Sequence, residues 1–554
     1  MTTKPANPPA DPRQPNAGPE STHQADPEPL PRRHIVLTMG GLMLAMFLAS
    51  LDQTIVSTAM PRIVADLGGF DRFTWVTTAY LVASTTVVPI AGRLSDLYGR
   101  KAFFLGGICI FLVGSVLAGL SQSMNQLIAF RAIQGIGGGN IMAMSLITVG
   151  DLFSPAERGK YQGVVAGVFG ISSVIGPTLG GFITDSLSWN WVFYVNMPLG
   201  LPVVALFIRF FPNIRPAGRM HRLDYAGMAL LVLIVVPLLI GLSLGGVQYE
   251  WFSLQVIGVL AFAAVMTLVF VVVERRASDP IMPLSIYSNR AVSVSLVAVF
   301  LTGFGMFGSI IFIPLFFQGV LGASATSSGS FLTPMMLGMV VAAGLSGQAL
   351  SRLGGHYRMQ GLVGIVVMGV GIALISRMTA DTSFGQAVAS IVITGIGLGI
   401  TFPSFTIAVQ NAIPPNQLGA ATAATQFYRS VGGALGLAVL GSYMANRFAT
   451  GLDDALPPPI RQALPEGQLA EMSNNPQALV NPEALDQLQT AFADRGPQGA
   501  AMLEQLLTAL RETLASAIGD VFLVVTVALA VAFVVTIFLK EVPLRTRRPG
   551  VRPD

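Results

Sequence analysis

Fourteen long apolar stretches divide the chain, and each of them is long enough to cross a lipid bilayer as a helix. A membrane-spanning helix needs about 20 predominantly apolar residues, and these stretches are rich in Gly, Ala and Ser, which allow helices to pack closely. The 554 residues include only 32 basic and 28 acidic side chains, whereas soluble domains carry about 25% charged residues. We therefore predict an all-α polytopic membrane protein. The predicted spans lie at about 35–57, 74–93, 102–121, 127–150, 161–184, 191–211, 224–245, 253–273, 291–315, 328–350, 360–377, 385–409, 420–444 and 519–540.

The distribution of lysine and arginine predicts the orientation of the chain. Basic residues are enriched in short cytoplasmic loops, and an arrangement with both termini in the cytoplasm places most of the 32 basic residues inside. The loop at 411–417 has no basic residue and does not support this orientation. The excess of Arg over Lys suggests a GC-rich bacterial genome, so we expect a bacterial inner-membrane protein. The net charge of +4 is small and gives no reason to expect a nucleic-acid partner.

Three polar segments lie outside the predicted spans. Residues 1–34 are rich in proline and poor in large apolar side chains, which predicts a disordered cytoplasmic tail, and residues 541–554 form a basic cytoplasmic tail. Residues 446–518 form a polar extracytoplasmic insertion between the last two spans, in which the apolar spacing of 502–514 favours surface helices. The insertion is either a structured loop without its own activity or a docking surface for an envelope partner.

The sequence contains no motif for enzymatic chemistry in the structural context that such a motif requires. The G-x-S-x-G pattern around Ser243 lies in an apolar stretch, and no histidine lies within the predicted spans, so the serine has no base within reach. The sequence contains no P-loop, dinucleotide fingerprint or HExxH motif. Cys109 is the only cysteine, which excludes an internal disulfide and a CxxC metal site. We expect no enzyme, no metal and no cofactor, with an ion gradient as the energy source.

The loop after the second span holds several charges between two glycines. Residues 92–101 read GRLSDLYGRK and resemble the major facilitator superfamily signature G-x-x-x-D-R/K-x-G-R-R/K, from which Leu97 departs. A degenerate copy at 347–358 suggests an internal duplication. The resemblance implies a conformational latch in which Asp96 meets the N-terminus of a helix in the other half; the alternative is a positive-inside anchor only. The implied latch residues are Gly92, Asp96, Gly99, Arg100 and Lys101.

Asp52 is the only acid deep within the predicted spans. A carboxylate there costs about 2.5–3.5 kcal/mol on insertion scales, so Asp52 is neutral, paired or open to a water-filled cavity. Arg131 lies at a similar depth, and Gln134 follows it on the same helical face. Residues 51–61 and 131–138 resemble signatures of the fourteen-helix drug:proton antiporter branch of the superfamily. This resemblance implies that Asp52 and Arg131 couple transport to protons; the alternative is a static ion pair.

The fifth span carries the most specific resemblance. Its sequence resembles the antiporter motif G-x-x-x-G-P-x-x-G-G, which marks exporters in that family, and small residues with one proline follow a single face of the helix. A glycine stripe alone would more often indicate close packing. The motif residues are Gly167, Gly170, Gly176, Pro177, Gly180 and Gly181.

Aromatic and methionine side chains of the later spans are candidates for lining a substrate cavity, with lipid contact or core packing as the alternative for each. Arg429 is an intramembrane cation for which the sequence offers no acidic partner, and it would either favour anionic substrates or bind carbonyl groups. The candidate cavity residues are Gln134, Phe304, Phe307, Met335, Met336, Phe402, Phe427 and Arg429.

The resemblance implies the major facilitator fold, with two six-helix bundles and two extra helices between them. The expected division is 35–211 for the N-terminal bundle, 212–280 for the linking helices, and 281–445 with 519–540 for the C-terminal bundle. We expect a monomer in the lipid bilayer that exports amphipathic or hydrophobic small molecules, as in multidrug efflux, in exchange for protons and by alternating access. The alternatives are an exporter of an endogenous lipid, siderophore or peptide, and a membrane receptor or assembly factor that transports nothing.

Overall fold

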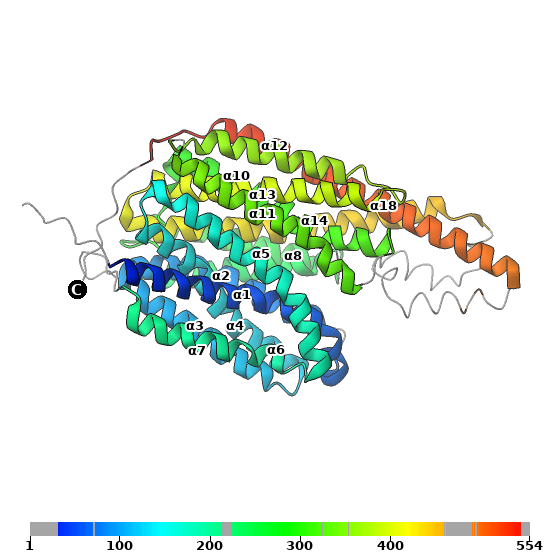
Figure 1. Cartoon of the computed structure of the whole chain (residues 1–554), viewed down its shortest axis with the longest axis horizontal. Helices are drawn as coiled ribbons and strands as arrows, with labels where there is room; N and C mark the ends of the chain where they lie inside the picture. Colours follow the sequence, from blue (N-terminus) through cyan, green and yellow to red (C-terminus); the bar gives the residue numbers. More distant parts are fainter. Residues whose placement is uncertain are drawn as a thin grey trace, which may run out of the picture.

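Long helices running along one common direction make up the structure (Figure 1). This computed structural model describes residues 31–69, 72–212, 223–246, 248–322, 325–352, 354–458 and 496–544, together with the single residues 460, 490 and 492. No β-strand occurs in these ranges, where one isolated bridge joins Gly245 to Tyr249. Most of the predicted tails and the middle of the predicted insertion lie outside the described residues.

The first six spans are α1 (Arg32–Leu67), α2 (Phe73–Tyr98), α3 (Arg100–Gly119), α4 (Met124–Leu152), α5 (Pro155–Ser186) and a broken span made of α6 (Trp191–Tyr194) and α7 (Asn196–Phe210). Particular residues at the helix ends determine where these helices begin and end. Gly68 and Gly99 follow α1 and α2 with φ angles of 66° and 98°, which glycine adopts without the steric penalty of a Cβ atom. Ser123 caps α4 by accepting a hydrogen bond from the Gln126 nitrogen.

The remaining spans are α8 (Tyr225–Leu244), α9 (Leu254–Glu274), α10 (Arg290–Gly319), α11 (Ala325–Arg352), α12 (Tyr357–Ile375), α13 (Phe384–Ala412), α14 (Leu418–Ala455) and α18 (Gly496–Ile537). Within the described residues, 13 helices are long and apolar enough to cross a membrane when α6 and α7 count as one. The more polar α14 lies alongside them in the bundle (Figure 1). The prediction of an all-α polytopic membrane protein is therefore confirmed.

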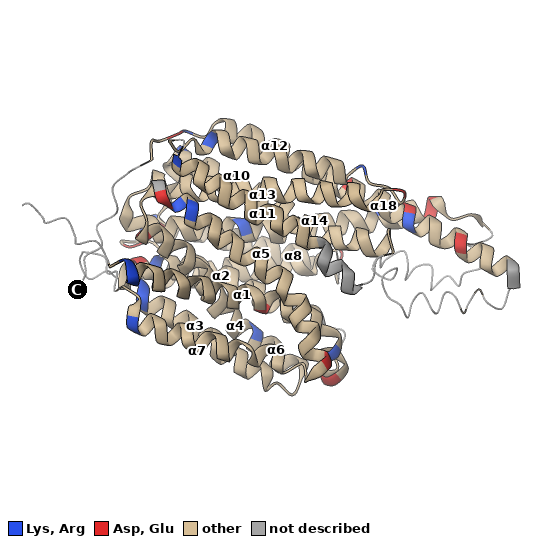
Figure 2. Cartoon of the chain, viewed as in Figure 1, with Lys and Arg blue, Asp and Glu red and all other residues tan. Residues whose placement is uncertain are grey.

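One end of the bundle is rich in basic residues. The start of α1 and the end of α18 lie at the same end, on the left of Figure 1. Figure 2 shows lysine and arginine positions concentrated toward this end, with few charged residues along the middle of the bundle. We refer to it as the terminal end and to the opposite one as the distal end.

Packing divides the spans into two groups with two additional helices. Buried apolar side chains of α1–α5 and α7 form one cluster, and those of α10–α14 and α18 form another. The groups meet chiefly where α5 packs against α11 and where α2 packs against α14. The additional helices α8 and α9 pack against each other, and α9 exposes much of its apolar surface, as expected of a helix that faces lipid. The sequence led us to expect two bundles with two extra helices, and the packing agrees with that expectation.

The last span is longer than the sequence predicts. It begins at residue 496 rather than at about 519, so the expected surface helix at 502–514 is continuous with the span. Leu506, Leu510 and Leu514 are completely buried in a cluster that includes apolar residues at the end of α14. Because this segment is apolar on one face only, average apolarity did not identify it as part of the helix. The paired ends of α14 and α18 extend beyond the other helices at the distal end (Figure 1).

Candidate functional site

Asp52, on α1, lies inside the first group of helices with 0% of its surface exposed. Its Oδ2 accepts a hydrogen bond from Arg131 Nη1 at 2.5 Å. Its Oδ1 accepts hydrogen bonds from Gln134 Nε2 at 2.8 Å and from Asn196 Nδ2 at 3.0 Å. A buried carboxylate is tolerated when it is paired and hydrogen-bonded, and these three donors satisfy both conditions.

Ser115, on α3, connects two of these donors. Its Oγ accepts hydrogen bonds from Gln134 Nε2 at 3.0 Å and from Asn196 Nδ2 at 2.8 Å, and it donates one to the Phe193 carbonyl oxygen at 2.8 Å. The buried polar network around Asp52 therefore draws its side chains from α1, α3, α4 and α7, and α6 contributes a backbone carbonyl. We refer to Asp52, Ser115, Arg131, Gln134 and Asn196 as the Asp52 network.

Glycines bring α4 close enough to its neighbours to form this network. A Cβ atom on Gly135 would lie 2.5 Å from the Tyr80 carbonyl oxygen, and one on Gly114 would lie 2.6 Å from the Gln134 nitrogen. Any larger residue would push α4 away from α2 or α3. The close packing also places the guanidinium carbon of Arg131 4.4 Å from the centre of the Tyr80 ring, where a cation–π interaction adds to the ion pair.

Three members of the network were predicted from the sequence, whereas Ser115 and Asn196 were not. Asn196 carried a usable signal, because it stands shortly before Pro198 in an apolar stretch and so marks a break in the sixth span. Ser115 carried no such signal, because serine is common in membrane helices as a packing residue.

Asp96, near the end of α2, bridges to the second group of helices. Its Oδ1 accepts a hydrogen bond from the Gly419 nitrogen at 3.0 Å and its Oδ2 accepts one from the Ala420 nitrogen at 2.9 Å. The carboxylate thus caps the N-terminus of α14, where unpaired N–H groups and the helix dipole favour an anion. Arg100 pairs with Asp96 at 2.5 Å and with Asp151 at 2.7 Å. Asp151 was missed because an acid at the end of a predicted span ordinarily faces water.

The other predicted latch residues make different contacts. Gly99 separates α2 from α3 with its positive φ. Gly92 approaches Gly419 so closely that an added Cβ atom would lie 2.9 Å from the Gly419 carbonyl oxygen. Lys101 Nζ donates a hydrogen bond to the Ile208 carbonyl oxygen at 2.9 Å, on α7 and not on α14. Asp96 and Gly92 therefore contact α14 directly, and Arg100 holds Asp96. Gly99 separates α2 from α3, and Lys101 contacts its own group of helices.

The predicted antiporter motif of α5 packs against two different helices. Gly176 and Gly180 face α1, where Thr54 and Thr58 are their nearest neighbours. Gly181 has no atom within 4 Å of the place that a Cβ would take. The second half of the motif therefore touches the helix that carries Asp52.

The first half of the same motif faces the second group of helices. Val340 on α11 is the nearest neighbour of both Gly167 and Gly170. Pro177 lies inside α5 directly after Gly176, within the part that contacts α1. One helix thus connects the Asp52-bearing helix with the other group.

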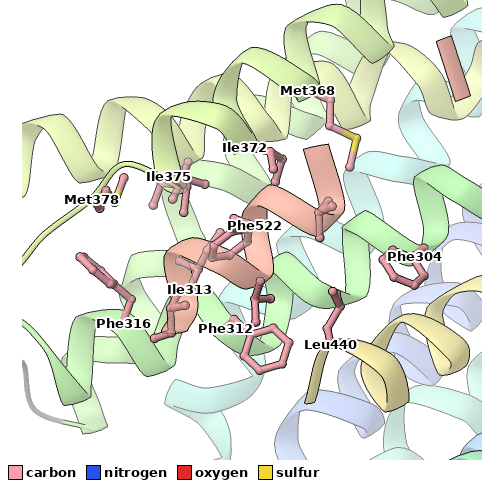
Figure 3. Close-up of a cluster of buried hydrophobic side chains, with 14 of the residues drawn as sticks. Phe304, Phe312, Ile313, Phe316, Met368, Ile372, Ile375, Met378, Leu440 and Phe522 are labelled. Atoms are coloured by element: carbon pink, nitrogen blue, oxygen red, sulfur yellow. The ribbon is translucent and has the colours of Figure 1, made fainter. Parts of the chain in front are cut away.

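Several candidate cavity residues lie in packed regions. Phe304, Met335 and Met336 are at most 8% exposed and belong to the buried cluster of the second group. Figure 3 shows Phe304 together with other members of this cluster, such as Leu440 and Phe312. Phe307 packs against Gly433, between α10 and α14. In this conformation the four side chains make core contacts, and their role in a cavity stays a prediction.

Phe402, Phe427 and Arg429 lie where the two groups of helices meet. Phe402 on α13 and Phe427 on α14 both pack against the buried cluster of the first group. Arg429 is buried, and its guanidinium carbon lies 4.1 Å from the centre of the Phe402 ring. Gln134, the remaining candidate, belongs to the Asp52 network. Among the described residues, no group of three or more His, Cys, Asp or Glu side chains is arranged for metal binding.

Comparison with known proteins identifies the family. The family model of the Major Facilitator Superfamily matches residues 42–222 and 223–437. This chain belongs to the major facilitator superfamily. It is 39% identical over 527 residues to the multidrug transporter protein MdtP of Bacillus subtilis (strain 168), covering 93% of this chain and 95% of that protein. It is 38% identical over 506 residues to multidrug resistance protein 3 of the same organism, covering 91% and 95%. The human organic anion transporter MFSD10 shares the fold, with a TM-score of 0.56 and 16% identity over 91% of this chain and 100% of that one.

Membership of the major facilitator superfamily makes this chain a secondary transporter with a small-molecule substrate and not an enzyme. The many apolar helices make it a multi-pass membrane protein. The predicted family, fold and transport function are confirmed. Within this superfamily member, the Asp52 network, the α14 junction at Asp96 and the two-sided α5 form the candidate transport machinery.

Proposed function

We propose that this transporter is a proton-coupled exporter of amphipathic or hydrophobic small molecules, as in multidrug efflux, and that it works in the bacterial inner membrane. The observation that carries the proposal is the completely buried ion pair between Asp52 and Arg131. Ionisable residues inside a membrane are costly and mark transport or proton pathways. The names of the two bacterial relatives, a multidrug transporter and a multidrug resistance protein, support the class of substrate.

Proton uptake by Asp52 would weaken this ion pair. Arginine keeps its charge at any relevant pH, so a neutral Asp52 leaves the Arg131 guanidinium with Gln134 Oε1, 2.7 Å away, and the Tyr80 ring as its partners. Hydrogen bonds to a neutral group are weaker than those to a charged one. Protonation therefore frees α1 to shift relative to α4.

The contacts of α5 carry such a shift to the other group of helices. Thr54 and Thr58, shortly after Asp52 on α1, touch Gly176 and Gly180 of α5. Nearer the terminal end, α5 packs along α11. A movement of α1 thus changes the surface on which α5 meets α11, which supports alternating access coupled to the proton.

We place the terminal end in the cytoplasm, with the N-terminus and the C-terminus inside, because basic residues gather at that end. In this orientation the junction between Asp96 and α14 closes the cytoplasmic side. Gly159 of α5 and Gly347 of α11, which approach through their backbones, close the same side. The protein is then closed toward the cytoplasm, and this closure supports a role of Asp96 as a latch.

Because one chain holds both groups of helices and the whole Asp52 network, we propose that the protein acts as a monomer.

The test is proton movement driven by a substrate. Full-length protein is reconstituted in liposomes that contain a pH-sensitive dye, and ethidium is added. We expect coupled proton flux in the wild type and its loss in Asp52→Asn, which keeps the shape of the side chain but cannot release a proton. Asp520→Asn is the control, because Asp520 is an acid on the surface of α18 that pairs with Arg447.

Each outcome of this test favours one function. Coupled flux that persists in Asp52→Asn would contradict the role of Asp52. Absence of flux in the wild type with ethidium and other cationic or neutral amphipathic dyes would favour a receptor or assembly factor. Flux only with lipids, siderophores or peptides would favour the exporter of an endogenous compound.

A further inference from the structure

Arg429 is a buried cation that the proposed proton coupling does not use. It lies about three turns after Leu418, the first residue of α14, and only 6% of its surface is exposed. Its backbone carbonyl packs against Gly303 of α10, and its guanidinium carbon lies over the Phe402 ring of α13. The residue therefore contacts α10 through its backbone and α13 through its side chain.

No partner of opposite charge accompanies Arg429 in the described part of the chain. None of the ion pairs there includes it, and its buried Nε has no hydrogen-bond partner. The carbonyl contact that is the alternative to an anionic substrate is also absent at Nε. Its contacts with the Gly303 backbone of α10 and the Phe402 ring of α13 supply no negative charge.

Arg131 provides an internal comparison. Both arginines are buried and both lie over an aromatic ring, but Arg131 is paired with the Asp52 carboxylate and with Gln134. An unpaired charge is far more costly to bury than a paired one, and arginine cannot shed its proton to avoid that cost. The structure thus keeps at Arg429 a charge for which the described residues supply no counterion.

The position of Arg429 suits contact with a transported molecule. The ring that it covers, Phe402, and the neighbouring Phe427 pack against the first group of helices, so the guanidinium lies beside the surface along which the two groups meet. Alternating access opens and closes that surface. A molecule held there would meet a planar cation next to aromatic rings.

We propose that Arg429 and Phe402 form an anion subsite, which binds a carboxylate or sulfonate group carried by an aromatic, amphipathic substrate. The guanidinium fork matches the planar geometry of these anions and forms charge-assisted hydrogen bonds with them, and Phe402 supplies apolar contact for the attached ring. This inference rests on the proposed export function and names the substrate class of the same transporter.

The experiment compares two dyes that differ by a single charge. Rhodamine B carries a free carboxylate, and in rhodamine B ethyl ester the same carboxyl group is esterified. Uptake of each dye is measured over a range of concentrations in everted membrane vesicles energised by a proton gradient. We expect Arg429→Gln to raise the half-saturating concentration of rhodamine B about tenfold and that of the ester less than about twofold. Arg429→Lys, which keeps the charge but loses the fork, should give an intermediate value for rhodamine B.

A matched control and a second measurement keep the inference open to refutation. Arg447→Gln removes an exposed arginine from the same helix. It should leave the half-saturating concentrations of both dyes unchanged. Equilibrium dialysis of the purified full-length variants gives the binding of both dyes even where transport is slow. Equal effects of Arg429→Gln on acid and ester, or no effect on either, would overturn the anion subsite. Failure of the wild type to take up the ester would instead count against the proposed export function.

Discussion

Ser115 is the residue whose contribution to the Asp52 network is easiest to isolate. Its hydroxyl accepts hydrogen bonds from Gln134 and Asn196, and it has a single donor contact, to the Phe193 carbonyl. Ser115→Ala leaves these buried groups short of a partner, which costs about 1–3 kcal/mol. We expect a lower thermal midpoint, measured by tryptophan fluorescence of the purified protein, together with slower coupled export.

Ser309→Ala is the matched control for this prediction. Ser309 is also completely buried, but its hydroxyl bonds only to the Gly305 carbonyl in its own helix, so its loss should change stability by no more than about 0.5 kcal/mol. Equal destabilisation by the two variants would contradict the idea that the network, and not burial of a serine, makes Ser115 important.

Among the residues of the Asp52 network, the charged pair could be predicted from the sequence and two of the neutral members could not. An acid within a long apolar stretch demands a partner, and Arg131 was the basic residue at a matching depth, so the Asp52–Arg131 pair followed from charge and helix direction. The neutral donors and acceptors did not, because Ser115 and Asn196 become buried network members only when α3, α4 and α7 come together. The pattern of residues along the chain does not predict that these three helices pack together at Ser115 and Asn196.

At the scale of the single helix, α5 acts through two surfaces that its glycines create. An added Cβ on Gly176 would lie 2.7 Å from the Thr54 Cβ, and Thr54 is a stiff, β-branched residue whose hydroxyl bonds to the Leu51 carbonyl at 3.0 Å. Gly176→Ala should therefore push α5 away from α1, at a cost of about 1–3 kcal/mol. We expect ethidium export in everted vesicles to fall roughly tenfold.

Gly181→Ala tests whether this effect comes from the helix contact. Gly181 belongs to the same motif, and a Cβ there meets nothing within 4 Å, so export should stay within about twofold of the wild type. If Gly181→Ala were as harmful as Gly176→Ala, the motif would act through backbone flexibility instead of close packing. The motif can be recognised in the sequence, but the two helices that it contacts cannot, since the small residues of one stripe do not reveal which helix each of them touches.

Across the whole molecule, the sequence predicted the number and order of spans and the family, because hydrophobic length and dense motifs are properties of the chain itself. It did not distinguish core from cavity, as Phe304, Met335 and Met336 show by packing in the second group. In a soluble protein, polarity separates inside from outside; in a membrane protein, lipid-facing and core positions are both apolar. The first part of α18 was not predicted as part of the span for a related reason, since only one of its faces is apolar.

The closed terminal end gives a prediction about the whole transport cycle. An added Cβ on Gly167 of α5 would lie 3.3 Å from the Val340 Cγ1 of α11, a place that a cysteine sulfur can take, so Gly167→Cys with Val340→Cys should form a disulfide. In a Cys109→Ser background, oxidation should fix the two groups together on the side of the terminal end and stop ethidium export, and a reducing agent should restore export. In each single-cysteine variant, the oxidant should leave the rate of ethidium export unchanged. Undiminished export by the cross-linked protein would mean that α5 and α11 stay together throughout the cycle, which alternating access by separation of the two groups does not allow.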